Sequence, residues 1–204
     1  MSRYTGPRAR ISRRLGTNIY GTRGEAHALD KRPFPPGIHG RTRRRGNTSE
    51  YLVQLQEKQK ARFTYGLTER QFRKVYAEAS RKTGVTGENM LRSLELRLDN
   101  VVYRAGWGST RPQARQFVSH GHVIVNGKRV NVPSYRVRKG DVVEVKEKTR
   151  TNPIVQWNKD VLDRTPPPWL DREEDFKVKV YSEPIREQID VPLREQLIVE
   201  LYSK

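Results

Sequence analysis

The 204-residue sequence contains no cysteine. This absence excludes disulfide bonds and thiolate zinc sites, and it fits a reducing compartment. The four histidines form no HExxH or similar array, so we expect neither a metal nor a cofactor. The apolar runs all fall short of the roughly 18 residues that a membrane-spanning helix needs.

The N-terminus also lacks the apolar segment of a secretory signal, and we expect a cytoplasmic protein. Its arginines and its scarcity of acid are typical of organellar transit peptides too, so that alternative stays open. Apolar residues make up only 34% of the chain. The hydrophobic core should therefore be modest, and part of the chain is expected to order only against a partner.

Positive charge is what the chain has in excess. Its 41 Lys and Arg against 23 Asp and Glu give a formal net charge of +18. Residues 1–150 hold 33 basic and 12 acidic side chains, whereas residues 151–204 hold 8 and 11. Such self-repulsion favours binding to a polyanion, so the first three quarters indicate a nucleic-acid binder. The C-terminal quarter should have a different task.

Residues 1–48 predict an extended basic arm without regular structure. Gly6-Pro7, Pro33 and Pro35-Pro36-Gly37 should break any helix, and no periodic apolar stripe is present. On composition alone, a disordered and solvated tail is an equally good interpretation.

Helical periodicity begins after the arm. Ser49 can cap a helix over 49–64, and Thr68 with Gln71 forms a capping box before a second helix over 69–83. Apolar residues keep the helical period over 87–105, and Thr110 can cap a short fourth helix. We group residues 49–86 as a small helical domain, completed by a C-terminal helix over 192–203.

The pattern changes to period two after residue 121. Alternating residues flank Asn126-Gly127, the strongest short hairpin signal, and a further strand is predicted over 142–145. Residues 87–150 thus predict a second domain with helices and an antiparallel sheet, and the fold class is α+β. Residues 151–191 predict a connector with a strand near 176–181, and their acidic balance indicates contact with a protein.

The short helix after Thr110 places Arg111 and Arg115 one turn apart on its outer face, where two guanidinium groups near a helix N-terminus could clamp phosphate. Lys128 and Arg129 follow the hairpin turn. A basic, solvated face on an ordinary α+β domain is the competing interpretation.

Four motifs resemble the S-four RNA-binding domain, an αL-type unit of two helices and an adjoining sheet that grips structured RNA. They are RLDNVVYR at 97–104, TRxxARQ at 110–116, HGHVxVNG at 120–127, and PSY with GD at 133–135 and 140–141. Outside this block, further motifs resemble the S-four family of bacterial small-subunit ribosomal proteins. These are RYxGP at 3–7, PGxHG at 36–40, QEKQK at 56–60, ERQF at 69–72, GEN at 87–89 and QLIVELYSK at 196–204.

This resemblance implies direct binding to 16S rRNA at a helix junction, a role in nucleating the 30S body, and an influence on accuracy with proteins S-five and S-twelve. It places Arg43, Arg44 and Arg45 near the messenger entry channel, in contact with mRNA. The rRNA-binding residues that we expect are Arg3, Tyr4, Arg8, Arg10, Arg13, Arg14, His39, Lys58, Lys60, Arg62, Arg70, Arg73, Lys74, Arg97, Asn100, Arg104, Thr110, Arg111, Arg115, His120, Lys128 and Arg129.

Many members of that family carry a cysteine cluster for zinc in the arm, but Ala9 and Ser12 stand at the first two such positions here. RNA contacts and internal packing must order the arm instead. An enzyme is not expected, since no phosphate-binding loop is present and too little chain remains for a catalytic domain. A free-standing RNA chaperone or translational repressor is the remaining alternative.

The final helix has an apolar side formed by Leu193, Leu197, Ile198 and Leu201. It is too short to be stable alone, so we expect it to fold back onto the helices at 49–64 and 69–83. We expect the acidic residues Glu173, Glu174 and Glu183 to face a neighbouring protein such as S-five.

Overall fold

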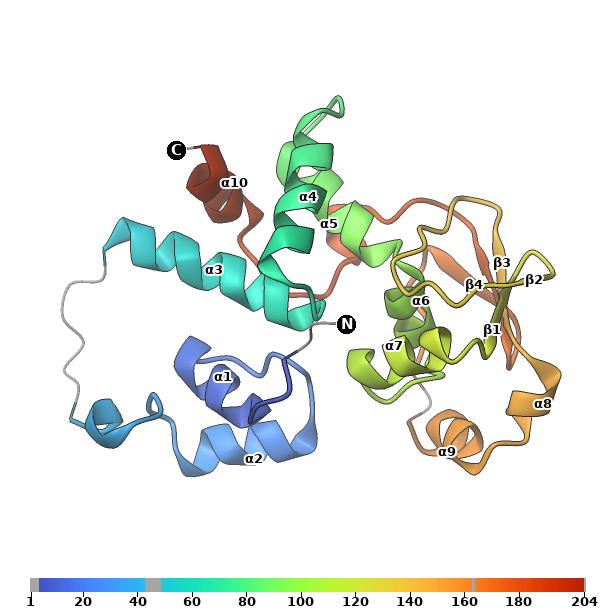
Figure 1. Ribbon diagram of the computed structural model, residues 1–204, viewed down its shortest axis with the longest axis horizontal. Coiled ribbons are helices and arrows are strands. Elements are labelled where there is room, and N and C mark those ends of the chain that lie inside the picture. Colours follow the sequence, from blue (N-terminus) through green and yellow to red (C-terminus); the bar gives the residue numbers. More distant parts are fainter. Residues whose placement is uncertain (1–3, 43–48, 163, 204) are drawn as a thin grey trace. The chain divides into compact units, whose positions relative to one another are not determined.

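The computed structural model describes residues 4–42, 49–162 and 164–203, and it divides into two compact units. The first unit combines Met1–Ala77 with Pro192–Lys204, and the second is Glu78–Val191. Figure 1 labels their helices and strands.

The arm contains helices, so the prediction of no regular structure over 1–48 is wrong. Helix α1 spans Arg8–Leu15, α2 spans Arg23–Lys31, and the short 3-10 helix η1 spans Ile38–Gly40. The expected breakers lie at the ends of these helices, with Pro7 as the N-cap of α1 and Gly16, at φ 69°, as its C-cap.

A small apolar cluster holds the arm. Ile11, Leu15 and Ile19 are buried together with Phe63, and Tyr4 meets Phe63 edge to face at 5.8 Å between ring centroids. Phe63 lies near the end of helix α3, Glu50–Thr64, whose N-cap Ser49 accepts a hydrogen bond from the Leu52 amide as predicted. Three apolar residues spaced over two turns were too few to stand out as a stripe in the sequence.

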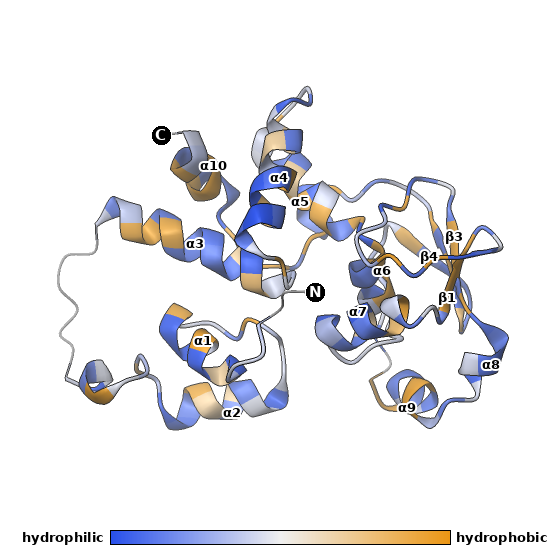
Figure 2. Ribbon diagram, in the orientation of Figure 1, coloured by the Kyte–Doolittle hydropathy of each residue, from blue (hydrophilic) through white to orange (hydrophobic). Residues whose placement is uncertain are grey.

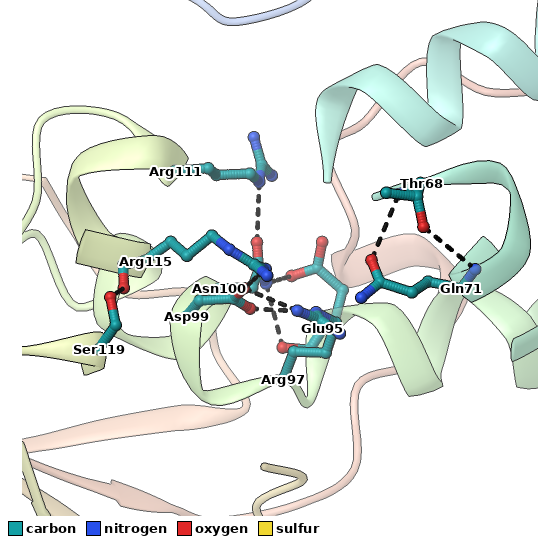
Figure 3. A network of polar contacts seen from close by, with 9 residues as sticks. All are labelled: Thr68, Gln71, Glu95, Arg97, Asp99, Asn100, Arg111, Arg115 and Ser119. Atoms are coloured by element: carbon teal, nitrogen blue, oxygen red, sulfur yellow. Dashed lines mark hydrogen bonds and ion pairs between the residues drawn. The ribbon is translucent and has the colours of Figure 1, made fainter. Parts of the chain in front are cut away.

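Helix α4 spans Glu69–Ser80, and its predicted capping box is confirmed. The Thr68 amide donates to Gln71 Oε1 at 3.3 Å, and the Gln71 amide donates to Thr68 Oγ1 at 3.4 Å (Figure 3). The helix ends three residues earlier than the period suggested.

Helix α10, Glu195–Ser203, packs along α3 within the first unit. Ile198 is fully buried, and the Tyr202 ring stacks on Tyr76 at 4.6 Å between centroids. The Tyr202 hydroxyl donates to Glu69 Oε1 at 2.8 Å. The C-terminal segment therefore completes the unit that the N-terminal residues begin.

The second unit is built around a five-stranded antiparallel sheet in the order β2-β1-β3-β5-β4. Strand β1 is Val123–Val125, β2 is Lys128–Arg129 and β3 is Val142–Val145. Strand β5, Lys177–Val180, lies within the stretch 176–181 that was predicted as a strand, and β4, Leu170–Glu174, precedes it in the segment predicted to hold a connector and strands. The mixed helical and antiparallel fold class is confirmed, and the sheet is larger than the sequence suggested.

Helices surround this sheet in the second unit. They are α5 at Thr86–Glu95, α6 at Leu98–Arg104, α7 at Arg111–Ser119, α8 at Glu147–Arg150, α9 at Pro153–Leu162 and the 3-10 helix η2 at Arg186–Gln188. Apolar residues of α6, α7 and the strands form one buried cluster that includes the fully buried Trp169. In Figure 2 the apolar residues of β1 and β3 stand out in orange.

The predicted continuous helix over 87–105 is wrong, because the chain breaks between α5 and α6. Leu96 caps the first helix, and Arg97 is extended at φ −71° and ψ 138°. The Val137 amide donates to the Leu96 carbonyl oxygen at 3.0 Å. The Val137 amide thus satisfies a carbonyl group at the C-terminal end of α5. In the sequence, the apolar period continues on both sides of Leu96, so it gave no sign of the break.

The predicted Asn-Gly hairpin is confirmed. Asn126 and Gly127 both have positive φ, at 48° and 75°, which is the conformation of a type I′ turn. Val125 pairs with Lys128 across it. Within the described residues, no helix is long and apolar enough to cross a membrane.

Candidate nucleic-acid interface

Helix α7 begins where the sequence predicted. Thr110 is extended and its hydroxyl accepts a hydrogen bond from the Gln113 amide at 3.3 Å, while Pro112 occupies the first turn. The Gln113 side chain reaches back to the Ser109 amide at 2.6 Å. This cap fixes the direction in which α7 presents its arginines, and it is the structural role of Thr110.

Arg111 and Arg115 are half-buried and turn onto α6, so the expectation that they project from an outer face is wrong. Arg111 Nε donates to Asn100 Oδ1 at 2.8 Å, and its guanidinium lies over the Tyr103 ring at 4.4 Å from the centroid. Arg115 Nη1 lies 3.0 Å from Asp99 Oδ2 (Figure 3). These contacts hold each of the two guanidinium groups in a fixed orientation.

A buried ionic base lies beneath these arginines. Glu95 is completely buried and accepts two hydrogen bonds from Arg104, both at 2.9 Å, and one from the Asn100 amide at 2.8 Å. Arg97 donates to both oxygens of Asp99, at 3.1 and 2.7 Å. We name these five residues (Glu95, Arg97, Asp99, Asn100 and Arg104) the ionic base, and Figure 3 shows all of them except Arg104.

The ionic base changes the interpretation of three expected rRNA-binding residues. Arg97, Asn100 and Arg104 are buried and bonded within the chain, so their role is structural rather than direct contact with RNA. Paired guanidinium and carboxylate groups can be buried only because each satisfies the other. Their counter-charges Glu95 and Asp99 were visible in the sequence, but charge alone does not tell a paired arginine from an exposed one.

The hairpin presents the exposed cations of this region. His120, Lys128 and Arg129 are all exposed, and Arg129 Nη2 donates to the His120 carbonyl oxygen at 3.3 Å. The Arg129 guanidinium lies over Gly121, whose positive φ of 72° favours glycine at this position. Burial, with His120 and Arg129 nearby, lowers the pKa of His122, which favours the neutral form of that ring.

Three further cations of the second unit escaped the sequence interpretation. Arg136, Arg138 and Lys139 are exposed in the segment between β2 and β3. A run of residues from 126 to 140 that has five basic and no acidic side chains was the signal that could have found them.

In the arm, some of the expected rRNA-binding side chains are exposed, and one is bonded within the chain. Tyr4, Arg8, Arg10, Arg14 and His39 are exposed. By contrast, Arg13 Nε donates to the carbonyl oxygens of Arg32 and Phe34, at 3.1 Å each, and its guanidinium lies over the Phe34 ring. Arg13 therefore has a structural role, because it connects α1 to the segment that follows α2.

A buried carboxylate joins α1 to α2. Ser12 Oγ donates to Glu25 Oε1 at 2.9 Å, and Thr22 Oγ1 donates to Glu25 Oε2 at 2.8 Å. Glu25 and Ser12 are buried, and the Ile19 amide donates to Ser12 Oγ at 3.4 Å. We name Ser12, Thr22 and Glu25 the arm clasp. Ser12 is one of the two residues that the resemblance implies to stand at cysteine positions of zinc-binding family members.

The basic residues in the helical part of the first unit are also of two kinds, those paired within the chain and those exposed. Lys58 is buried and paired with Glu69 at 2.9 Å, so it is corrected to a structural residue. Lys60 is half-buried and pairs with Glu57, and Arg62 Nε donates to Gln59 Oε1 at 2.9 Å. The remaining expected contacts, Arg70, Arg73 and Lys74, are exposed on α4. Arg3, Arg43, Arg44 and Arg45 lie outside the described residues.

Comparison with known proteins covers nearly the whole of both units. Residues 3–95 match the family model of the ribosomal protein S4/S9 N-terminal domain, and residues 96–143 match that of the S4 domain. The chain is 57% identical to the small ribosomal subunit protein uS4 of Mycobacterium sp. (strain KMS) and 54% identical to that of Saccharopolyspora erythraea. It is 56% identical to that of Mycolicibacterium smegmatis, and each match covers 100% of both chains.

Proposed function

The chain belongs to the uS4 family of small ribosomal subunit proteins, and we propose that it binds 16S rRNA directly at a junction of several helices. A protein of this family is a structural component of the ribosome and not an enzyme. Its place is the small subunit of cytoplasmic ribosomes, where binding at the junction helps nucleate the 30S body.

The observation that carries this proposal is the arrangement of charge in the second unit. Exposed Lys128, Arg129 and His120 lie beside α7, whose Arg111 and Arg115 are oriented by the ionic base. A rigid set of guanidinium and ammonium groups suits the fixed phosphate geometry of folded RNA. The exposed basic residues of the arm and of α4 are proposed as separate RNA contacts of the first unit.

The finer assignments concern neighbours in the subunit. Among the acidic residues expected to face a protein, Glu173 is paired with Lys177 at 2.9 Å and Glu183 with Arg92 at 3.5 Å, and both stay on the surface. This acidic surface supports a contact with a basic protein, which we propose to be S-five. We also propose that the chain, together with S-five and S-twelve, influences the accuracy of translation. Arg43, Arg44 and Arg45 are proposed to touch the messenger at its entry.

Salt dependence tests the rRNA proposal. If about 6–10 phosphates are neutralised, the slope of log Ka against log salt should lie between about −4 and −9, and a transcribed 16S junction fragment should bind far more tightly than tRNA. The measurement is a filter-binding titration of the full chain at several KCl concentrations. A slope near −1, or equal affinity for the two RNAs, contradicts the proposal.

Sucrose-gradient sedimentation separates this proposal from a free-standing RNA chaperone or translational repressor. A ribosomal component should travel quantitatively with small subunits at moderate salt. A protein that stays at the top of the gradient while small subunits form normally would favour the alternative.

A further inference from the structure

The segment between β2 and β3, which Figure 1 draws as a loop, carries a partly exposed aromatic side chain. Tyr135 is 39% exposed and Val132 is 50% exposed. Within the described part of the chain, the Tyr135 side chain makes no hydrogen bond and no aromatic contact. Tyrosine carries a large apolar face with a polar tip, which is why it is enriched at binding surfaces.

The backbone under this ring is rigid. The Tyr135 carbonyl oxygen accepts a hydrogen bond from the Leu98 amide at 2.8 Å, and the Pro133 carbonyl oxygen accepts one from the Asp99 amide at 3.2 Å. Both donors belong to the first turn of α6, where amides have no partner within the helix. The Tyr135 amide itself donates to the Val132 carbonyl oxygen at 3.0 Å. The ring is therefore displayed in advance of binding, which reduces the entropy lost when a ligand packs on it.

The segment that carries the ring is basic along its sequence. The segment 126–140 has no acidic residue, and its five basic side chains are all exposed: Lys128, Arg129, Arg136, Arg138 and Lys139. Arg136 is oriented by an ion pair with Glu78 of the same unit. A ligand of this surface must therefore be anionic and must also offer a flat face to the ring.

We propose that Tyr135 is a stacking platform for an unpaired nucleobase of the RNA bound by the second unit, with the flanking cations on the adjoining phosphates. This inference rests on the proposed rRNA-binding function and adds a residue and a mode of contact to it. Proteins recognise RNA loops and bulges by stacking splayed bases on aromatic rings, and this contact tolerates any base. An acidic peptide would satisfy the cations but offers no comparable flat face.

The test compares tyrosine variants of the full chain in binding to a transcribed 16S junction fragment at fixed KCl. Tyr135→Ala should weaken binding by about 5- to 150-fold, the range for loss of one stacked base. Tyr135→Phe and Tyr135→Trp should bind nearly as wild type, because both keep a ring. The salt slope should not change, since no charge is removed.

Trp157→Ala is the control. Trp157 is 52% exposed on α9 of the same unit, a helix whose charged residues are one lysine and one aspartate, so its loss should leave affinity unchanged. Tryptophan fluorescence monitors folding of every variant, because Trp107, Trp157 and Trp169 all belong to the second unit.

The outcomes separate the inference from the proposed function. If wild type does not prefer the junction fragment to tRNA, the proposed function fails and the inference falls with it. If wild type discriminates but Tyr135→Ala binds equally well, the stacking inference alone is overturned. If Tyr135→Ala binds the junction fragment normally but fails to enter subunits, the ring makes a protein contact. If Tyr135→Ala lowers the salt slope, the substitution has disturbed the neighbouring cations. Either result also overturns the stacking inference.

Discussion

Glu95→Ala is expected to lower the free energy of unfolding of the second unit by about 3–5 kcal/mol. Glu95 is completely buried, and its two oxygens accept hydrogen bonds from Arg104 and Asn100. Removing the carboxylate leaves a buried guanidinium without its main counter-charge. Arg104 also forms an ion pair, at 2.6 Å, with Asp190, but Asp190 is largely exposed and so is a weaker counter-charge.

A urea titration followed by tryptophan fluorescence measures this effect in the full chain, because the tryptophans report only on the second unit. Glu187→Ala is the control: Glu187 is exposed in the same unit, and its loss should change stability by no more than about 0.5 kcal/mol. Equal midpoints for the two variants would mean that the ionic base contributes nothing, and the structural role given to Arg104 would be wrong.

The second large effect is expected in the arm. Glu25→Ala should release α1 from α2, because the hydroxyls of Ser12 and Thr22 each lose their acceptor, and the buried Ser12 hydroxyl alone costs about 1–3 kcal/mol when it is left unsatisfied. The exposed arginines of α1 would then be displayed on a disordered segment. Affinity for the junction fragment should fall, because the arm would have to order at the moment of binding.

Hydrogen exchange of the α1 amides measures the loss of order directly. Asp30→Ala removes the same charge from the exposed face of the same helix and should leave exchange unchanged. Glu25→Gln should give an intermediate effect, since its amide oxygen can accept only one of the two hydroxyls. Unchanged protection in Glu25→Ala would show that the apolar cluster around Phe63 holds the arm without the clasp.

The features that could be predicted from the sequence are those whose physical cause is local. The Thr68–Gln71 capping box, the Ser49 cap and the Asn126-Gly127 turn each depend on side chains within four residues, and all three were predicted. The fold class followed from the change of period near residue 121.

The errors have non-local causes. The break at Leu96–Arg97 depends on partners about 40 residues further along the chain, and strand β4 buries only Leu170 of its five residues, so it has no alternating signal. The buried Arg97 and Arg104 look in the sequence like surface cations. Only the fold places Glu95 and Asp99 against them, and it thereby separates the basic residues that build the site from those that can reach RNA.

The most direct test of the central claim uses the absence of cysteine. Lys128→Cys and Glu174→Cys each give a chain with one thiol on the surface of the second unit, to which an iron chelate can be attached. Hydroxyl radicals from each probe then cut nearby RNA in reconstituted small subunits. We predict strong cleavage of the 16S helix junction from position 128 and weak cleavage from position 174. Strong cleavage from position 174 with none from position 128 would contradict the claim that the basic hairpin region, rather than the acidic surface, binds the rRNA.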